Sequence, residues 1–357
     1  MEPLTSLFAV QSKPLLIAGP CGAESMQQLE SLVLELKKIP SFNLLRAGVW
    51  KPRTRPTGFQ GYGVEALSWL QEIRKRHLIP VAVEVATPYH VEEALKHQMD
   101  VLWIGARTTV NPLVVQDIVS SISGVNIPVL IKNPIHPDVK LWIGAVERFL
   151  NSGITQLAAV HRGFYSYTPS VYRNPPHWAV ALDFKTQFPQ IPLYVDPSHI
   201  CGNRTHLLEI SQEAFNLGYQ GLMIETHPNP EMALSDSEQQ ISPDSLIALW
   251  KKLVVRNPLS MPSNRLSELR KRMDEQDRLF FNQLAERFKW VAPMADVKKE
   301  MGQTIFQLER WREILLTRTQ WAEELGLSAE FVQKLCQLIH DESIRLQQNQ
   351  WNQDSLE

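Results

Sequence analysis

Four side chains of the kinds that bind divalent metal ions lie at or beyond the ends of short apolar runs. Cys21, His199 and Glu225 each follow such a run, and Asp236 stands in the segment beyond Glu225. A thiolate, an imidazole and two carboxylates form a mixed sulfur, nitrogen and oxygen ligand set, which suits a borderline divalent metal ion and leaves room for a substrate. The sequence therefore predicts a metal site built from the ends of several strands.

Cationic side chains follow most of the other apolar runs. Like charges brought together repel one another unless an anion of comparable charge binds between them. Arginine suits bidentate recognition of phosphate or carboxylate, and lysine acts as a point charge. We therefore expect small substrates with more than one phosphate or carboxylate group. The cations are Arg46, Lys51, Arg53, Arg107, Lys132 and Arg162.

The apolar runs recur through the first 250 residues and alternate with amphipathic segments. This pattern predicts an α/β fold, a (β/α)8 (TIM) barrel, in which the residues after the strands share the C-terminal face. A polar residue after one run could simply be a strand end, but such residues accompany every run, including Glu84 in the third and His161 after the sixth. The sequence leaves open whether His161 contacts a ligand or packs. The runs lie at 14–19, 43–48, 79–85, 101–105, 128–131, 156–160, 192–195 and 221–224.

Length and composition narrow the class of protein. The chain has 357 residues, 44% of them apolar, and a formal net charge of -2, so nucleic acid and anionic membrane are not expected partners. Its three cysteines are too few and too far apart for a disulfide framework. There is no run of transmembrane length and no basic region followed by a long apolar stretch, and we expect a cytoplasmic protein.

The strand pattern stops after residue 254. We predict a barrel domain at 1–254, a Pro- and Ser-rich linker at 255–263 and an all-α domain at 264–357. Helical apolar spacing indicates three helices, at about 265–299, 304–325 and 328–351, with Pro293 as a possible kink or end of the first. Three amphipathic helices bury little apolar surface alone, so this domain is expected to dimerise.

Residues from about 14 to 254 resemble 3-deoxy-D-arabino-heptulosonate 7-phosphate (DAHP) synthases of the short type Iβ group. The resemblance rests on long motifs in a fixed order. They are GPCGAES at 19–25, RAGVWKPRT at 46–54, GFQG at 58–61, GAR at 105–107, KNP at 132–134, HRG at 161–163, DPSH at 196–199 and ETHPNPEMALSDSEQ at 225–239.

This resemblance implies a condensation of phosphoenolpyruvate with erythrose 4-phosphate that depends on one divalent metal ion, Mn²⁺, Fe²⁺, Co²⁺ or Zn²⁺. Cys21, His199, Glu225 and Asp236 match the metal ligands. Lys51 and Glu84 are the implied proton-handling residues, without an assignment of which gives and which takes. The implied phosphoenolpyruvate contacts are Arg46, Lys51, Arg107, Lys132 and Arg162, and the implied erythrose 4-phosphate contacts are Lys51, Pro52, Arg53 and Thr54. A sister synthase that uses arabinose 5-phosphate is the nearest rival, and the KPRT loop favours the four-carbon aldehyde.

Residues 269–348 resemble the all-helical, AroQ-type chorismate mutases, which convert chorismate to prephenate. Three arginines suit the substrate carboxylates, whereas Lys298 and Gln347 suit the ether oxygen. In this family a dimer shares each site, and Arg270 would come from the partner subunit. Gln307 stands where the family usually has Asp, and Trp311 where it has a Glu that holds the substrate hydroxyl. The matching positions are Arg270, Arg287, Lys298, Arg310, Ser343 and Gln347.

Two hypotheses follow for the helical domain. In the first, the chain is a bifunctional homodimeric enzyme, and prephenate or chorismate bound to the helical domain inhibits the condensation. In the second, the helical domain is not catalytic and only dimerises and senses a ligand. The departures at Gln307 and Trp311 keep the second hypothesis open.

Overall fold

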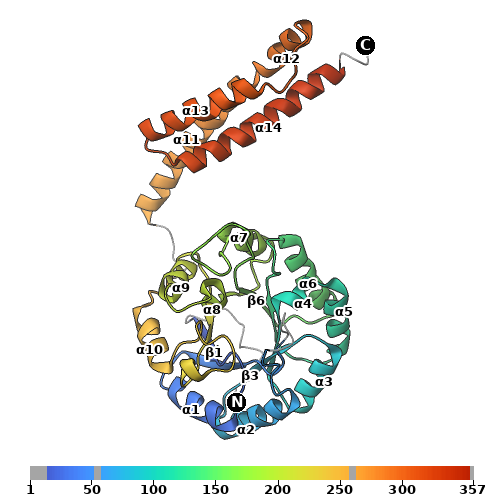
Figure 1. Ribbon diagram of the computed structural model, residues 1–357, viewed down its shortest axis with the longest axis vertical. Helices are drawn as coiled ribbons and strands as arrows, with labels where there is room; N and C mark the ends of the chain where they lie inside the picture. The colour runs from blue at the N-terminus through green and yellow to red at the C-terminus, as the bar shows by residue number, and fades with distance from the viewer. Residues whose placement is uncertain (1–13, 52–57, 257–262, 354–357) are drawn as a thin grey trace. The chain divides into compact units, whose positions relative to one another are not determined.

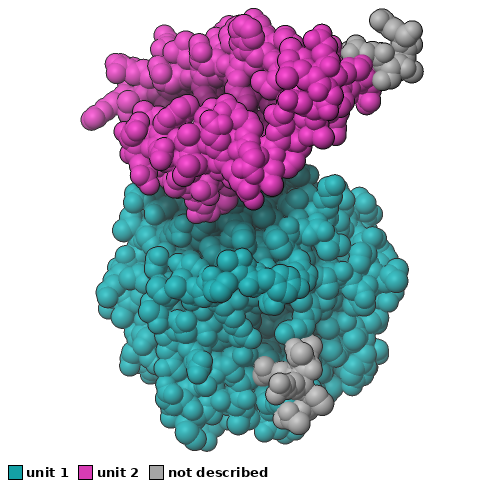
Figure 2. Space-filling view, turned by 45° about the horizontal axis from the view of Figure 1, so that its top comes forward, with its two compact units in different colours: residues 1–258 teal, residues 259–357 magenta. Residues whose placement is uncertain are grey.

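The structure is a computed structural model that describes residues 14–51, 58–256 and 263–353. The chain divides into two compact units, Met1–Pro258 and Leu259–Glu357 (Figure 2). The first unit is an α/β barrel and the second consists of helices.

The first unit is a closed barrel of eight parallel strands, and each strand pairs with its neighbours in sequence (Figure 1). β8 pairs with β1 and closes the barrel, with Gly19 opposite Glu225 in the register. The fold predicted from the apolar runs is therefore confirmed. The strands are β1 (Leu15–Gly19), β2 (Phe42–Ala47), β3 (Val81–Val85), β4 (Val101–Ile104), β5 (Val129–Lys132), β6 (Leu157–His161), β7 (Leu193–Val195) and β8 (Gly221–Glu225).

The strands are apolar on both faces because each face packs against other parts of the unit. In β1, Leu15 and Ile17 point into the barrel and join an inner cluster that includes Trp103 and Met223. The alternate residue Leu16 belongs to the larger cluster between strands and helices. Side chains of successive strand residues point to opposite faces, so a continuous apolar run fills both layers.

Helices surround the barrel on its outer side (Figure 1). Several begin at a side chain that accepts a hydrogen bond from the first turn, as Ser25 does from the Gln28 N–H and Asp138 from the Leu141 N–H. These caps fix the residues at which the loops that follow the strands end and the helices begin. The helices are α1 (Met26–Leu36), α2 (Val64–His77), α3 (Pro88–Lys96), α4 (Ala106–Thr109), α5 (Pro112–Ser121), α6 (Val139–Asn151), α7 (Trp178–Gln187), α8 (Pro197–Cys201), α9 (Leu207–Asn216) and α10 (Pro243–Lys252), with a 3-10 turn, η2, at Pro230–Met232.

The second unit contains four helices in its described part, where the sequence indicated three. They are α11 (Asn264–Phe288), α12 (Val291–Glu300), α13 (Leu308–Glu324) and α14 (Ala329–Gln353). The segment expected as one helix at 265–299 is interrupted after Phe288. Pro293 explains the break, because it has no N–H to donate to the carbonyl of Lys289, one turn earlier, and its ring crowds that carbonyl. α14 packs against both α12 and α13 (Figure 1).

Helix α11 differs from every helix of the barrel because none of its residues is buried. Its large apolar side chains Leu269, Met273, Phe280 and Phe281 are all exposed. An amphipathic helix normally buries its apolar face, so this surface calls for a covering partner. Within the described residues, no helix is long and apolar enough to span a membrane.

Candidate active sites

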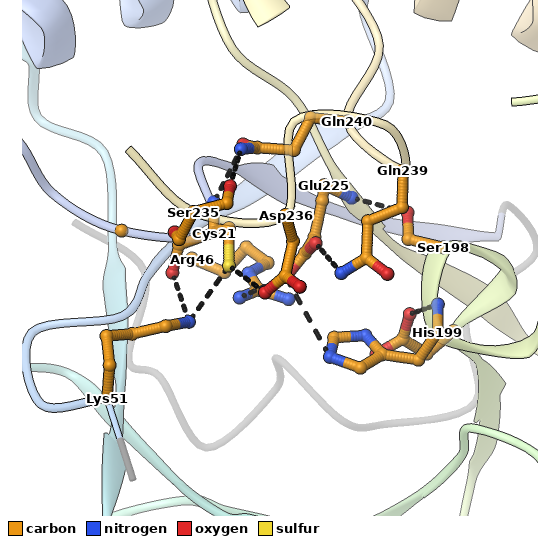
Figure 3. Close-up of polar contacts among 12 residues, drawn as sticks. Cys21, Arg46, Lys51, Ser198, His199, Glu225, Ser235, Asp236, Gln239 and Gln240 are labelled. Atoms are coloured by element: carbon orange, nitrogen blue, oxygen red, sulfur yellow. Dashed lines mark hydrogen bonds and ion pairs between the residues drawn. The ribbon is translucent and has the colours of Figure 1, made fainter. Parts of the chain in front are cut away.

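Cys21 lies just beyond the end of β1 and is fully buried (Figure 3). Its thiol is 3.2 Å from Asp236 Oδ2 and 2.9 Å from Lys51 Nζ. Gly19 permits this path, because a Cβ at that position would lie 2.0 Å from the Arg46 carbonyl oxygen. Burial, together with the charge of Glu225, raises the pKa of the Cys21 thiol to about 12.

Glu225, at the end of β8, and Arg46, on β2, form a fully buried ion pair. Arg46 Nη2 lies 3.1 Å from Glu225 Oε1, and the guanidinium stands 4.9 Å above the Trp103 ring. Gln239 donates to Glu225 Oε2 at 2.6 Å. Among the described residues, Arg46 Nε and Nη1 have no hydrogen-bond partner. Two unpaired donors on a buried guanidinium are well suited to an anionic ligand.

His199 and Lys132 share the buried carboxylate of Asp196. Asp196 Oδ2 is 2.8 Å from His199 Nδ1 and 2.7 Å from Lys132 Nζ. Although burial acts to raise it, the charges of His199 and Lys132 hold the pKa of Asp196 well below its usual range. The contact at Nδ1 leaves His199 Nε2 directed toward Glu225 Oε1, 3.9 Å away. An orienting carboxylate of this kind is typical of histidines that bind metal ions.

The four predicted metal ligands meet in two pairs, Cys21 with Asp236 and His199 with Glu225 (Figure 3). Within the described residues, no group of three or more His, Cys, Asp and Glu side chains is arranged so as to hold a metal ion. The donor types nevertheless fit a borderline divalent ion, and Glu225 Oε1 is a buried oxygen without a hydrogen-bond partner in the described part of the chain. The residues present therefore fit a metal ion that would join the two pairs.

A cavity of about 450 Å³ opens beside these donors. It brings together residues at or beyond the C-terminal ends of seven strands, β2 to β8. Burial, together with the charges of Arg173 and Arg107, lowers the pKa of Arg162 to about 10, against the opposing effect of Asp196. An anionic ligand would offset the repulsion between Arg162 and these two arginines. The predicted residues that line the cavity are Lys51, Glu84, Arg107, Lys132, Arg162, His199 and Asp236.

A second cavity of about 460 Å³ shares Lys51 and Glu84 with the first. Its other walls include Trp50 and His90, whose rings stack with centroids 4.0 Å apart. Lys51 and Glu84 therefore stand between two spaces. The predicted contacts Pro52, Arg53 and Thr54 follow Lys51 directly but lie outside the described residues.

His161, which the sequence left open, packs and holds a loop. It is buried, its Nδ1 lies 2.8 Å from the Tyr219 hydroxyl and its Nε2 lies 2.6 Å from the Pro176 carbonyl. A carbonyl only accepts, so Nε2 carries the proton and Nδ1 accepts from Tyr219. Burial lowers the pKa of His161 to about 3, and this neutral ring fixes the loop that carries Arg162.

Three residues of this site were not singled out in the sequence. Arg173 lines the cavity and donates to Gln239 at 3.1 Å, while Asn174 accepts from Arg162 Nη1 at 2.9 Å and donates to the His199 carbonyl at 2.7 Å. Arg173 and Asn174 belong to a long loop without periodicity, which gave no signal. Gln239 lies inside the quoted 225–239 motif, so its place was visible but its contact with Glu225 was not.

In the helical unit, four of the predicted residues meet on neighbouring helices. Arg287 donates to the Ser343 hydroxyl at 3.1 Å, and Lys298 donates to Gln347 Oε1 at 3.0 Å. Ser343 and Gln347 are buried and lie one turn apart on α14. Burial lowers the pKa of Lys298. The pairing builds a cationic surface patch from α11, α12 and α14.

The other two predicted residues, Arg310 and Arg270, are not joined to these four. Arg310 donates to Glu313 at 2.6 Å, and Arg270 makes no hydrogen bond or ion pair within the described part of the chain. Gln307 donates to Gln303 at 2.8 Å. Trp311 packs its ring on His340, with the centroids 4.2 Å apart. One copy of the helical unit therefore presents only part of the predicted site.

The closed barrel, its cation-lined cavity and its metal-type donors define the class of (β/α)8-barrel enzymes with an anion-binding active site. Residues 8–256 match the DAHP synthetase I family and residues 269–348 match chorismate mutase type II. The chain therefore belongs to the DAHP synthetase I family and carries in addition a chorismate mutase domain. The chain is therefore an enzyme, and both of the families that it matches are families of enzymes.

Individual relatives agree with this assignment for the barrel. The chain is 30% identical to a phospho-2-dehydro-3-deoxyheptonate aldolase of Thermotoga maritima over 239 residues, 67% of each chain. It is 29% identical to a 2-dehydro-3-deoxyphosphooctonate aldolase of Stenotrophomonas maltophilia over 262 residues, 67% of this chain and 89% of the relative. The crystal structure of the Thermotoga maritima DAHP synthase superposes with a TM-score of 0.61 at 27% identity and covers 68% of each chain.

Proposed function

We propose that the barrel condenses phosphoenolpyruvate with erythrose 4-phosphate to give DAHP and phosphate. The observation that carries the proposal is the cation-lined cavity beside the four metal-type donors. Arg107, Lys132 and Arg162, which line the cavity, would hold the phosphate and carboxylate of phosphoenolpyruvate, and the unpaired donors of Arg46 would bind the same anion. The second cavity and the segment Lys51, Pro52, Arg53 and Thr54 would accept the aldehyde phosphate.

Cys21, His199, Glu225 and Asp236 would hold one divalent ion, Mn²⁺, Fe²⁺, Co²⁺ or Zn²⁺. Such an ion supplies Lewis acidity that polarises or orients the aldehyde oxygen. Lys51 and Glu84 would move the protons of the condensation. This role is supported by the 2.9 Å distance between the Lys51 ammonium and the Cys21 sulfur and by the presence of Glu84 in the walls of both cavities.

Metal binding has a test that is independent of activity. Titration of the metal-free protein with Co²⁺ should produce the strong near-ultraviolet absorption of a cobalt–thiolate bond. Cys21→Ser should abolish that absorption, whereas Cys201→Ser, at a buried thiol in α8, should keep it. Retention of the absorption in Cys21→Ser would remove Cys21 from the site.

The choice of aldehyde separates the proposal from its rival. Some relatives carry names that refer to the eight-carbon product, 2-dehydro-3-deoxyphosphooctonate. We expect phosphoenolpyruvate to be consumed faster with erythrose 4-phosphate than with arabinose 5-phosphate, measured by the loss of its ultraviolet absorption. The opposite preference would assign the barrel to the rival reaction.

The helical domain is proposed to convert chorismate to prephenate. Arg287, Arg310 and Arg270 of the partner subunit would bind the two carboxylates, while Lys298 and Gln347 would stabilise the charge that develops on the ether oxygen. Ser343 would hold Arg287 in place. The exposed apolar face of α11 supports a homodimer in which each site is shared. If the protein stays monomeric in solution at micromolar concentration, this arrangement is contradicted.

We further propose that prephenate or chorismate, bound to the helical domain, inhibits the condensation in the cytoplasmic enzyme. Such coupling requires that the ligand bind two states of the protein differently. Deletion of residues 260–357 should remove the inhibition, and Lys298→Ala in the full chain should weaken it. If the helical domain binds chorismate without converting it, the alternative function of a dimerising sensor applies. Inhibition that persists in the shortened protein would refute the coupling.

A further inference from the structure

His340 lies on the same face of α14 as the two buried polar residues of the helical site. It precedes Ser343 by three residues and Gln347 by seven, which places all three along one stripe of the helix. Trp311, from α13, packs on the imidazole with centroids 4.2 Å apart, and Phe306 meets it edge-on at 5.8 Å. Two aromatic rings therefore fix the position of His340 beside the cationic patch.

Burial and two neighbouring cations favour the neutral form of the His340 ring. Burial lowers the pKa of His340, and the positive charges of Lys298 and Arg287 lower it further, against the opposing effect of Asp341. The packed aromatic rings of Trp311 and Phe306 carry no charge. Within the described residues neither nitrogen of His340 has a hydrogen-bond partner. A neutral imidazole of this kind can accept one hydrogen bond and donate another.

The other polar groups of the stripe are already occupied within the chain. The Ser343 hydroxyl accepts from Arg287 and donates to the Ile339 carbonyl at 2.7 Å. Gln347 accepts from Lys298 and donates to the Ser343 carbonyl at 3.2 Å. On α13, Glu313 binds Arg310 and Glu309 binds Arg312 at 2.8 Å. His340 is therefore the polar residue of the stripe whose side chain makes no hydrogen bond within the described part of the chain.

Chorismate carries two carboxylates, an ether oxygen and one ring hydroxyl. The arginines, Lys298 and Gln347 account for the first three groups, and Ser343 already binds Arg287 and the Ile339 carbonyl. The unused acceptor of His340 therefore matches the remaining group, the hydroxyl. Phe306 has no polar atom and Trp311 can only donate, so of the three packed rings His340 is the one that accepts.

We propose that His340 is a substrate-contacting residue of the helical site: its imidazole accepts the hydrogen bond of the chorismate hydroxyl, and Trp311 holds the ring in place. The inference rests on the proposed chorismate mutase function. It adds a specificity element, because a substrate with the hydroxyl is favoured over an analogue that lacks it. An imidazole packed against two aromatic rings has little freedom to rotate. The preference for a hydroxylated substrate should therefore be present before the substrate binds.

The test compares His340→Leu, which keeps an apolar side chain at the position, with His340→Gln, which restores a hydrogen-bonding group. The full-length protein is assayed for chorismate consumption and for inhibition by two bicyclic dicarboxylate analogues of the rearrangement, one with the ring hydroxyl and one without. In His340→Leu we expect kcat/KM for chorismate and affinity for the hydroxylated analogue to fall about tenfold, the effect of one hydrogen bond. Affinity for the analogue without the hydroxyl should stay unchanged.

Partial recovery in His340→Gln and no change in Leu338→Ala, at an exposed position of α14, complete the expected result. Equal losses for both analogues would overturn the proposal and assign His340 a packing role only. Unchanged kinetics in His340→Leu would also overturn it. If the wild-type chain neither binds nor converts chorismate, the proposed mutase function fails, and the inference fails with it.

Discussion

The two candidate sites differ in whether their charged side chains are buried or exposed. In the barrel, Arg46, Lys132, Asp196 and Glu225 are buried, and each has a counter-charge from another strand end of the same chain. In the described part of the helical unit the buried polar side chains are Ser343 and Gln347, whereas Lys298 is half-buried and the predicted arginines are exposed. The barrel therefore encloses its candidate site, whereas one helical unit presents only part of the predicted one.

This difference in burial should also affect how substitutions change the free energy of unfolding. Buried ion pairs are expensive to break, because removal of one partner leaves the other charged and without solvent. Exposed pairs such as Arg310 with Glu313 contribute little. Substitutions in the barrel site should therefore alter stability as well as activity, whereas substitutions in the helical site should alter activity and assembly.

The largest effect is expected from Glu225→Ala. Arg46 would be left buried without its partner, and we expect the barrel to lose about 3–5 kcal/mol of unfolding free energy together with its condensation activity. Urea unfolding followed by circular dichroism measures the loss. Glu231→Ala breaks the exposed pair with Arg204 and should change stability by less than about 1 kcal/mol. A small loss in Glu225→Ala would show that the pair is not held as described.

Lys298→Ala should separate the two activities. Loss of the ammonium beside Gln347 should lower kcat/KM for chorismate by about 10²–10³, as when a donor to developing charge is removed. Consumption of phosphoenolpyruvate, measured without prephenate, should be unchanged. Lys271→Ala, at an exposed position of α11, is the matched control. Equal falls in both activities would mean that the two units do not act separately.

Complementation tests whether one helical site needs two chains. Arg270→Ala and Lys298→Ala should each lack mutase activity. When the two variants are unfolded together and refolded, half of the dimers should be mixed, and one of the two sites in each mixed dimer should be intact. About a quarter of wild-type activity should return. If no activity returns, Arg270 and Lys298 act within the same chain.

The smallest effect concerns pH. The pKa of His161 is about 3 in the folded barrel against about 6.5 in an unfolded chain, so the folded state binds fewer protons between these values. Its contribution to stability is complete above pH 6.5 and is lost as the pH falls through this window. His161→Gln should be less stable at pH 7.5 but should lose less further stability by pH 5. Parallel curves for the two proteins, measured by urea unfolding, would contradict the buried neutral ring.

The sequence predicted the barrel because each strand is a continuous apolar run followed by a polar residue, a local feature. Cys21, His199 and Glu225 could be selected from their types and from the runs before them. The ion pair of Arg46 with Glu225 could not be predicted, because it depends on how strands 179 residues apart in sequence meet across the barrel.

Contacts made by loops and helix faces were harder to predict from the sequence. Arg173 lies in a loop without periodicity, and the break after Phe288 depends on how strongly Pro293 acts against a long amphipathic pattern. Trp311 was visible as a departure from a family pattern, but its contact with His340 arises only when α13 packs on α14. Packing between elements, which has no sequence period, accounts for these cases.

The most direct test of two separate sites in one chain uses a single preparation with and without a chelator. We predict that chelation stops phosphoenolpyruvate consumption in the presence of erythrose 4-phosphate, that added Mn²⁺ restores it, and that chorismate consumption continues throughout. If chorismate is not consumed, or if chelation stops both reactions or neither, the account is contradicted.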